Sequence, residues 1–377
     1  MIYILYSNDY EVFLGGNHLS EAEVLIDTTE NVLSACEEVD VPMTLFSDLA
    51  CLWRYRELGF TDFPERVDQQ LKQALKRGHD VQTHIHPHWF EADIVRDDKG
   101  ASAYHFDLAK FLLGNWQTKP GETLKSSYVG IFQRAKAYLE DLLTPIKSDY
   151  ACVSYRAGGY GIQPNVDLIF EALIESGYTI DSSIVPGMVL DSNVNTIDFR
   201  GVPREGNYLI DPAQGIEMAA DRGVFEIPVM ALRKGEARGL LARAFLRKLM
   251  RYFNKPSKPK HPGYPIQVSG TAAPKKSILR EVLTELKLIQ NGSYMLELGT
   301  DVDLMLTATR SYIKRYNSEG SDLFFSVSCH SKSTHPELLS AFKKYHLELK
   351  SIYGEKIKAI TFQQADQLLK SKKRMTQ

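Results

Sequence analysis

The chain has 377 residues, of which 44% are hydrophobic and 24% are charged, as is typical of a globular protein with one large or two medium domains. Its 45 basic and 47 acidic side chains give a formal net charge of −2, so no overall field favours nucleic acid or another polyanion as a partner. No apolar run approaches the roughly 20 residues that span a bilayer, and four widely spaced cysteines without a CxxC pair argue against a disulfide framework or a thiolate zinc site.

Apolar runs of strand length alternate with segments whose apolar residues recur at helical spacing. In the first half of the chain we expect strands at 2–7, 41–48, 79–86, 150–159 and 178–184, with helices at 27–41, 64–78, 124–143 and 164–177. Further on we expect strands at 223–232, 323–330 and 357–362, and helices at 275–290 and 335–354. Repeated β-α units predict a parallel sheet, and a count of about seven to eight strands predicts a TIM-like barrel formed by one domain over residues 1–377.

One region interrupts this alternation. Residues 185–275 are rich in Gly, Pro and Asn and are expected to form an insertion or lid. Within it, residues 233–260 carry ten basic side chains against one acidic one, with apolar residues interleaved. A solvated helix packed by one face is the ordinary interpretation. Contact with an anionic membrane surface or a lipid-phosphate carrier is the alternative.

The expected location follows from the four widely spaced cysteines together with the start of the chain. The segment MIYILYSNDYE lacks the basic start, long apolar stretch and cleavage site of a signal peptide. We therefore expect a cytoplasmic protein, with a peripheral contact at the inner membrane face if residues 233–260 bind lipid.

Polar side chains gather at the ends of the expected strands, where barrel enzymes build their active sites. Each of several strands ends in a residue that can bind a metal or transfer a proton. These residues are Asp9, Glu11, His84, His86, His88, Arg156, Asp181 and His330.

The histidines carry the strongest signal, because His84, His86 and His88 fall within five positions beside a strand end. Neutral imidazoles with a carboxylate commonly bind zinc or a similar divalent ion and leave a position open for water. We expect His86 to be the ring that lies behind the metal or faces the substrate. The alternative is a chance group of surface or capping histidines.

Asp9 and Glu11 point to the same side if the strand continues, so one carboxylate could bind the metal while the other takes a proton. Solvated loop acids are the alternative.

Arg156 could pair with a carboxylate and lower its pKa, or form a structural ion pair. For Asp181 the alternative to a catalytic role is a cap at its strand end. For His330 the alternative is a buried core side chain or a cap.

With these residues in place, the chain resembles the polysaccharide deacetylases with NodB homology. SNDYE, HIHPH, RAGGYG, DSS and SVSCH stand in the order of the family's motifs and cover nearly the whole chain. The resemblance implies a distorted (β/α) barrel that removes N-acetyl or related acyl groups from sugars with one divalent metal ion, for which zinc is the first expectation. The start of the chain and the HIHPHW turn are similar to a branch found in surface-polysaccharide synthesis, including that of lipopolysaccharide.

The resemblance also implies roles. His84 and His88 would bind the metal, and the third ligand would be Glu11 or Asp9. Asp9 would be the catalytic base, and Arg156 would hold it. His330 would be the acid that protonates the leaving amine, and Asp181 would tune that acid. The residues expected to face the substrate are His86, Gly158 and Tyr160.

Several positions depart from the family's pattern and imply a divergent substrate pocket. Asn8 and Tyr10 flank Asp9 where the family usually has two adjacent aspartates. Ile85 replaces a Ser or Thr, Gly158 replaces a proline, and Cys329 replaces an apolar residue before the last histidine.

The expected partner is an acylated amino sugar within a polysaccharide or its lipid- or nucleotide-linked precursor, and no nucleic acid. Two other classes stay open. One is a metal-dependent amidohydrolase or phosphoesterase, since HIH is also a His-x-His element. The other is a sugar-binding protein that keeps the fold without turnover.

Overall fold

The computed structural model describes residues 1–98, 100–118, 120–191, 196–233, 235–236, 239–240, 246, 293–318 and 320–376. Its main sheet contains eight strands in one path and a ninth beside β1. In spatial order the path is β11 (Tyr208–Ile210), β12 (Val224–Glu226), β8 (Ile180–Asp181), β7 (Ser154–Ala157), β4 (Asp80–Ile85), β3 (Met43–Asp48), β1 (Ile2–Tyr10) and β15 (Leu323–Cys329), with β16 (Ile357–Ala359) paired to β1.

Strand β1 lies next to one end of this path and has three strand neighbours. It pairs in parallel with β15 along one edge, and with β3 and β16 along the other. The remaining neighbours from β3 to β12 are also parallel, and only β11 runs antiparallel. Isolated bridges from Val229 to Ser326 and from Glu297 to Ser328 join β15 to the segment that follows β12 and to an irregular segment outside the main sheet. The predicted α/β fold, a distorted TIM-like barrel of about seven to eight parallel strands, is therefore confirmed as a curled, mostly parallel sheet that forms a half-barrel.

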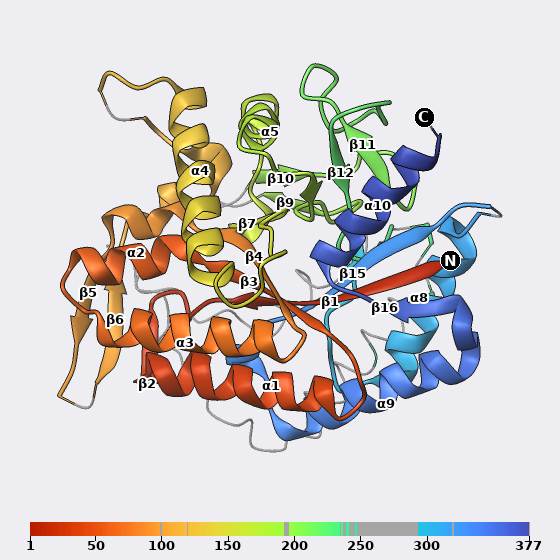
Figure 1. Ribbon diagram of the computed structural model, residues 1–377, viewed down its shortest axis with the longest axis horizontal. Helices are drawn as coiled ribbons and strands as arrows, with labels where there is room; N and C mark the ends of the chain where they lie inside the picture. Colours follow the sequence, from red (N-terminus) through yellow and green to blue (C-terminus); the bar gives the residue numbers. More distant parts are fainter. Residues whose placement is uncertain are drawn as a thin grey trace.

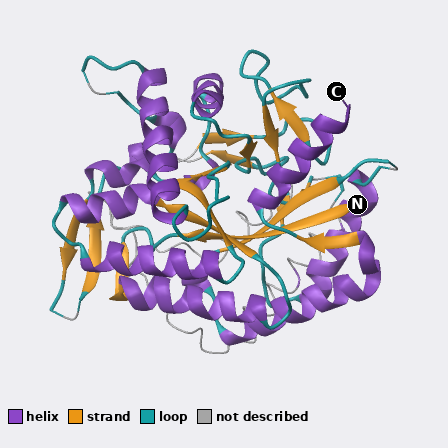
Figure 2. Ribbon diagram, viewed as in Figure 1, coloured by secondary structure: helices purple, strands orange, loops and turns teal. Residues whose placement is uncertain are grey.

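Helices surround the sheet (Figures 1 and 2). They are α1 (Thr28–Glu37), α2 (Leu49–Glu57), α3 (Asp62–Lys76), α4 (Leu124–Leu143), α5 (Val166–Glu175), α8 (Val302–Tyr316), α9 (Pro336–Tyr353) and α10 (Phe362–Thr376). α1, α3 and α9 run along the lower side of the view in Figure 1, and α4 and α5 stand on the upper side.

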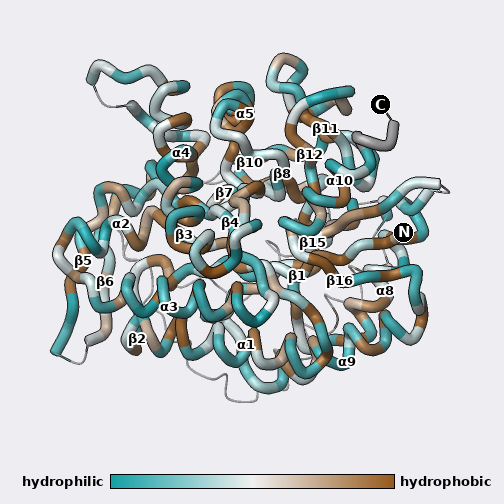
Figure 3. Tube along the Cα trace, in the orientation of Figure 1, coloured by the Kyte–Doolittle hydropathy of each residue, from teal (hydrophilic) through white to brown (hydrophobic). Residues whose placement is uncertain are grey.

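Helix α3 shows why these segments fold as they do. Its Val67, Leu71 and Ala74 are fully buried and recur at helical spacing, so they form one apolar stripe against the sheet. Gly78, at φ +90°, follows the helix and turns the chain toward β4. In Figure 3 the colours of α3 alternate between hydrophilic and hydrophobic along the chain, as expected of a helix with one buried face.

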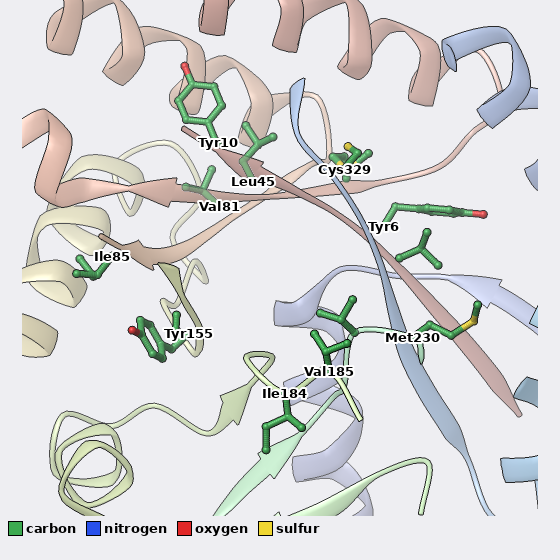
Figure 4. Close-up of a cluster of buried hydrophobic side chains, with 14 of the residues drawn as sticks. Tyr6, Tyr10, Leu45, Val81, Ile85, Tyr155, Ile184, Val185, Met230 and Cys329 are labelled. Atoms are coloured by element: carbon green, nitrogen blue, oxygen red, sulfur yellow. The ribbon is translucent and has the colours of Figure 1, made fainter. Parts of the chain in front are cut away.

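The hydrophobic core lies between the sheet and these helices. Tyr6 and Tyr10 of β1, Leu45 of β3 and Val81 of β4 are almost completely buried and belong to one contiguous cluster. Figure 4 shows these side chains together with others from β7 and from the segment after β8. This packing fixes the strands whose ends carry the candidate site.

The structure adds elements that the sequence patterns did not predict. Helices α2, α8 and α10 are among them. So are the small sheets formed by β2 (Gly16–Ser20), β6 (Ala101–His105) and β5 (Asp93–Arg96), and by β9 (Val189–Asp191) and β10 (Thr196–Asp198). The strand expected at 223–232 is divided into β12 and β13 (Ala231–Leu232), and β13 pairs with the unpredicted β14 (Tyr294–Met295).

The predicted insertion at 185–275 is only partly described. Two of its segments, β11 and β12, belong to the main sheet, so this stretch is not all an addition to the barrel. The expected helix at 275–290 and nearly all of the basic segment 233–260 lie outside the described residues. Among the helices that are described, none has the length and apolar character needed to cross a membrane.

Candidate active site

A cavity of about 200 Å³ opens where the parallel strands end. β1, β4 and β15 are neighbours or near neighbours in the sheet, so their carboxyl ends meet at one edge. Most of the predicted residues meet there. The lining side chains and backbone come from Asp9, Glu11, Val12, Leu14, His84, His86, His88, Trp89, Phe111, Gly159, Tyr160, His330 and Lys332.

Three of these residues are placed to hold a metal ion. Ligand atoms of Glu11, His84 and His86 all lie within 4.8 Å of one another. Oε2 of Glu11 is 2.7 Å from Nε2 of His86 and 3.5 Å from Nε2 of His84. Two imidazoles and one carboxylate are a donor set that suits zinc and similar divalent ions.

The environment of His84 supports this assignment. Its Nδ1 lies 2.9 Å from the carbonyl oxygen of Arg156, which accepts a hydrogen bond and so directs the proton to Nδ1. The Nε2 atom then carries the lone pair that can bind a metal ion. This atom is buried and makes no hydrogen bond. Metal-binding histidines are usually held in this way, with the second ring nitrogen bonded to a backbone carbonyl. The residues present therefore fit a divalent metal.

Glu11 is ionised in this setting. Burial is the largest influence and opposes ionisation, but Lys332 and the two histidines outweigh it and hold the pKa of Glu11 well below its usual range. Burial likewise opposes protonation of His84, yet Glu11 and Asp9 raise its pKa overall. The cluster is thus a set of largely buried groups whose charges influence one another.

His88 is placed differently from the motif's assignment. Both of its ring nitrogens are buried without a hydrogen-bond partner, and the ring packs on Phe106 and Phe111 at centroid distances of 4.3 and 5.3 Å. The turn Pro87–Glu91, a short 3-10 helix, directs this ring among aromatic side chains. The three-residue cluster therefore contains His86 where the motif assigned His88, and it contains Glu11 as its carboxylate.

Arg156 and Asp9 form a buried ion pair at 2.7 Å. Arg156 is fully buried, and all five of its N–H donors are used: one on Asp9 and the others on Ser7, on Ser326 and on the hydroxyl and carbonyl of Ser182. Burial tends to raise the pKa of Asp9, but Arg156, His84 and His330 lower it below its ordinary value. Asp9 is therefore an ionised carboxylate with one oxygen fixed by Arg156.

His330 stands among carboxylates. Its Nε2 is 3.6 Å from Oδ2 of Asp9 and 3.5 Å from Oε1 of Glu11, and its Nδ1 is 3.9 Å from Oε1 of Glu297. Glu297 was not predicted. It is aligned with β15 by a bridge to Ser328, and the sequence held no signal for this placement because Glu297 lies in an irregular segment.

Asp181 was expected to tune His330, but its hydrogen bonds are made elsewhere. Its two oxygens accept from the backbone N–H and the hydroxyl of Ser183 at 2.9 and 2.8 Å, and Glu226 is its register partner on β12. Burial raises the pKa of Asp181, and burial together with Asp181 raises that of Glu226. Asp181 does not line the cavity, so it supports the sheet behind Arg156.

Gly158 lies against His86 and Tyr160 lines the cavity, and their contact with substrate stays a prediction. A Cβ on Gly158 would lie 2.4 Å from Nδ1 of His86, so glycine is needed for the ring's position. Tyr160 lines the cavity and has φ +60°, a strained left-handed conformation for a side chain of this size.

Two further polar residues near the cluster were missed by sequence reasoning. Lys332 lies 2.8 Å from Oε1 of Glu11, and the expected role of His330 two positions earlier could have drawn attention to it. Asp48, at the end of β3, accepts a hydrogen bond from the backbone of His86 at 3.2 Å. Burial raises the pKa of Asp48.

No family model matches the sequence, and no curated protein matches it. Among solved structures, the chain is similar to a putative polysaccharide deacetylase from Mycobacterium smegmatis, with 12% identity, a TM-score of 0.45, and coverage of 99% of this chain and 91% of that one. It is also similar to Puue allantoinase, with 12% identity, a TM-score of 0.41, and coverage of 96% and 87%. Identities this low say nothing about the substrate.

Proposed function

We propose that this protein is a metal-dependent hydrolase that removes an N-acyl group, acetyl in the first instance, from an amino sugar of a polysaccharide or of its lipid- or nucleotide-linked precursor. One observation carries the proposal. A potential metal cluster of Glu11, His84 and His86 lies in the same cavity as the ionised Asp9 and as His330. The sugar and the acyl group follow from the motif resemblance.

The arrangement suits amide hydrolysis, in which water is a weak nucleophile and the amine a poor leaving group. When bound, a divalent ion polarises a carbonyl group and lowers the pKa of water to about 7. Asp9 would accept the proton of the attacking water, because Arg156 keeps it ionised and fixes one of its oxygens. His330, 3.6 Å from the other oxygen, would deliver a proton to the leaving nitrogen.

The test is a comparison of metal content and hydrolysis. Purified protein is loaded with Zn²⁺ and incubated with N-acetylated chito-oligosaccharides, and released acetate is measured, for the wild type and for His84→Ala and Asp9→Asn. We expect about one ion per chain in the wild type, loss of the ion in His84→Ala, and retention of the ion without acetate release in Asp9→Asn. A wild type that binds no divalent ion would refute the proposal. A metal-loaded wild type that is inactive on every acylated amino sugar would favour a sugar-binding protein.

We also propose that residues 233–260 bring the protein to an anionic membrane surface or a lipid-linked substrate. The basic and apolar composition of this segment supports the proposal. Flotation with anionic vesicles tests it, with neutral vesicles as the control. Binding that is unchanged when Arg243, Arg247 and Arg251 are neutralised would contradict it.

A further inference from the structure

Lys332 lies beside the proposed metal cluster and lines the same cavity. It belongs to the short turn Ser331–Ser333 that follows β15. Its ammonium group donates to Oε1 of Glu11 at 2.8 Å and to the carbonyl oxygen of Val12 at 3.0 Å. Only 11% of the side chain is exposed, so water screens this charge little.

The two oxygens of Glu11 face different partners. Oε2 lies next to the ring nitrogens of His86 and His84, whereas Oε1 lies next to Lys332. A buried carboxylate without a compensating charge is costly. Lys332 therefore supplies, within the chain itself, positive charge that a metal ion would otherwise bring to Glu11.

We propose that Lys332 is a positioning residue that sets the metal affinity of this site: it stabilises Glu11 when no metal is bound and weakens metal binding by competing for the same carboxylate. The inference rests on the proposed function, since it takes Glu11 as a ligand. Without Lys332, the metal-free protein contains an undercompensated carboxylate, which a divalent ion then relieves. Removing the lysine thus lowers the stability of the metal-free protein and tightens metal binding.

The experiment uses the full chain and Zn²⁺ alone. Zinc affinity is measured by competition with a coloured chelator, and thermal unfolding is followed with and without the ion. Lys332→Met removes both charge and donor, Lys332→Gln keeps a donor, and Lys332→Arg keeps both. The matched control is Lys125→Met, because Lys125 forms a 2.9 Å pair with Glu171 at the surface, where the two side chains are 46% and 42% exposed.

We expect Lys332→Met to unfold at lower temperature without zinc and to bind zinc roughly tenfold more tightly or better, the scale on which residues behind a ligand change metal affinity. Its unfolding temperature should rise more on zinc addition than that of the wild type, because stabilisation grows with the ratio of ligand to Kd. Lys332→Arg and Lys125→Met should match the wild type. Lys332→Gln should be intermediate, and it supplies the affinity comparison if the methionine variant does not fold.

Two results overturn different conclusions. Equal or weaker zinc binding by folded Lys332→Met or Lys332→Gln, beside a wild type that binds zinc, refutes the role of Lys332 and leaves the proposed hydrolase standing. Absence of zinc binding in the wild type and in every Lys332 variant refutes the metal site and the proposed function together.

Discussion

Substitution of Gly158 by alanine tests the position of His86 most directly. The backbone of Gly158 is not in the left-handed region, so alanine is acceptable there on conformational grounds. The added Cβ would lie 2.4 Å from Nδ1 and 2.5 Å from Cγ of His86, and 2.6 Å from the carbonyl oxygen of Ile85. Carbon atoms do not approach this closely, so the ring must move away.

The expected cost follows from overpacking, which is typically about 1–3 kcal/mol. Displacing His86 should also weaken zinc binding by about 10- to 100-fold. The control is Gly130→Ala on α4, where a Cβ meets nothing within 4 Å. This change should stabilise the protein by up to about 1 kcal/mol, because alanine is the better helix former.

Urea unfolding with and without zinc, together with a zinc titration, gives both quantities. A Gly158→Ala protein with wild-type stability and wild-type zinc affinity would show that His86 either does not occupy this position or does not bind the metal. A loss of stability in Gly130→Ala as large as that in Gly158→Ala would show that the effect is not specific to the site.

Three further outcomes are expected. Arg156→Met removes the charge that compensates the buried Asp9 and leaves the other polar partners of Arg156 unpaired, so the free energy of unfolding should fall by about 3–5 kcal/mol; a melting curve like that of the wild type would contradict this. His86→Ala should lose zinc while His88→Ala keeps it, as read by metal analysis, and the opposite pattern would favour the motif's assignment of His88. Burial raises the pKa of Asp80 from 3.8 to about 6, so the folded state holds a proton that the unfolded state releases between these pH values. Relative to Asp80→Asn, the wild type should therefore lose about 2 kcal/mol of stability as the pH rises from 4 to 6, and parallel urea-midpoint profiles would refute that pKa.

The sequence predicted the strands that build the site, because apolar runs and helical spacing report burial along the chain. It also placed Asp9, Glu11, His84, Arg156 and His330 at strand ends, and the structure brings them together. It could not distinguish His86 from His88, because the turn at Pro87 decides which way each ring points.

Long-range neighbours were equally invisible to pattern reasoning. Glu297 reaches His330 only because an isolated bridge aligns it with β15, and Asp181 forms hydrogen bonds with Ser183 on its own side of the sheet. Helix α2 was missed because it follows β3 without a loop and buries most of its residues, so it lacks the alternation of polar and apolar faces that marks a surface helix.

The hydrogen bonds of Arg156 have a consequence for how this scaffold can change. One guanidinium group connects β1, through Ser7 and Asp9, to β15, through Ser326, and to Ser182 just beyond β8. The interaction that keeps Asp9 charged therefore also joins strands from distant parts of the chain. A mutational route to a new activity that alters Asp9 must then keep a partner for this arginine, because a buried guanidinium without a compensating charge would destabilise the strands that it joins.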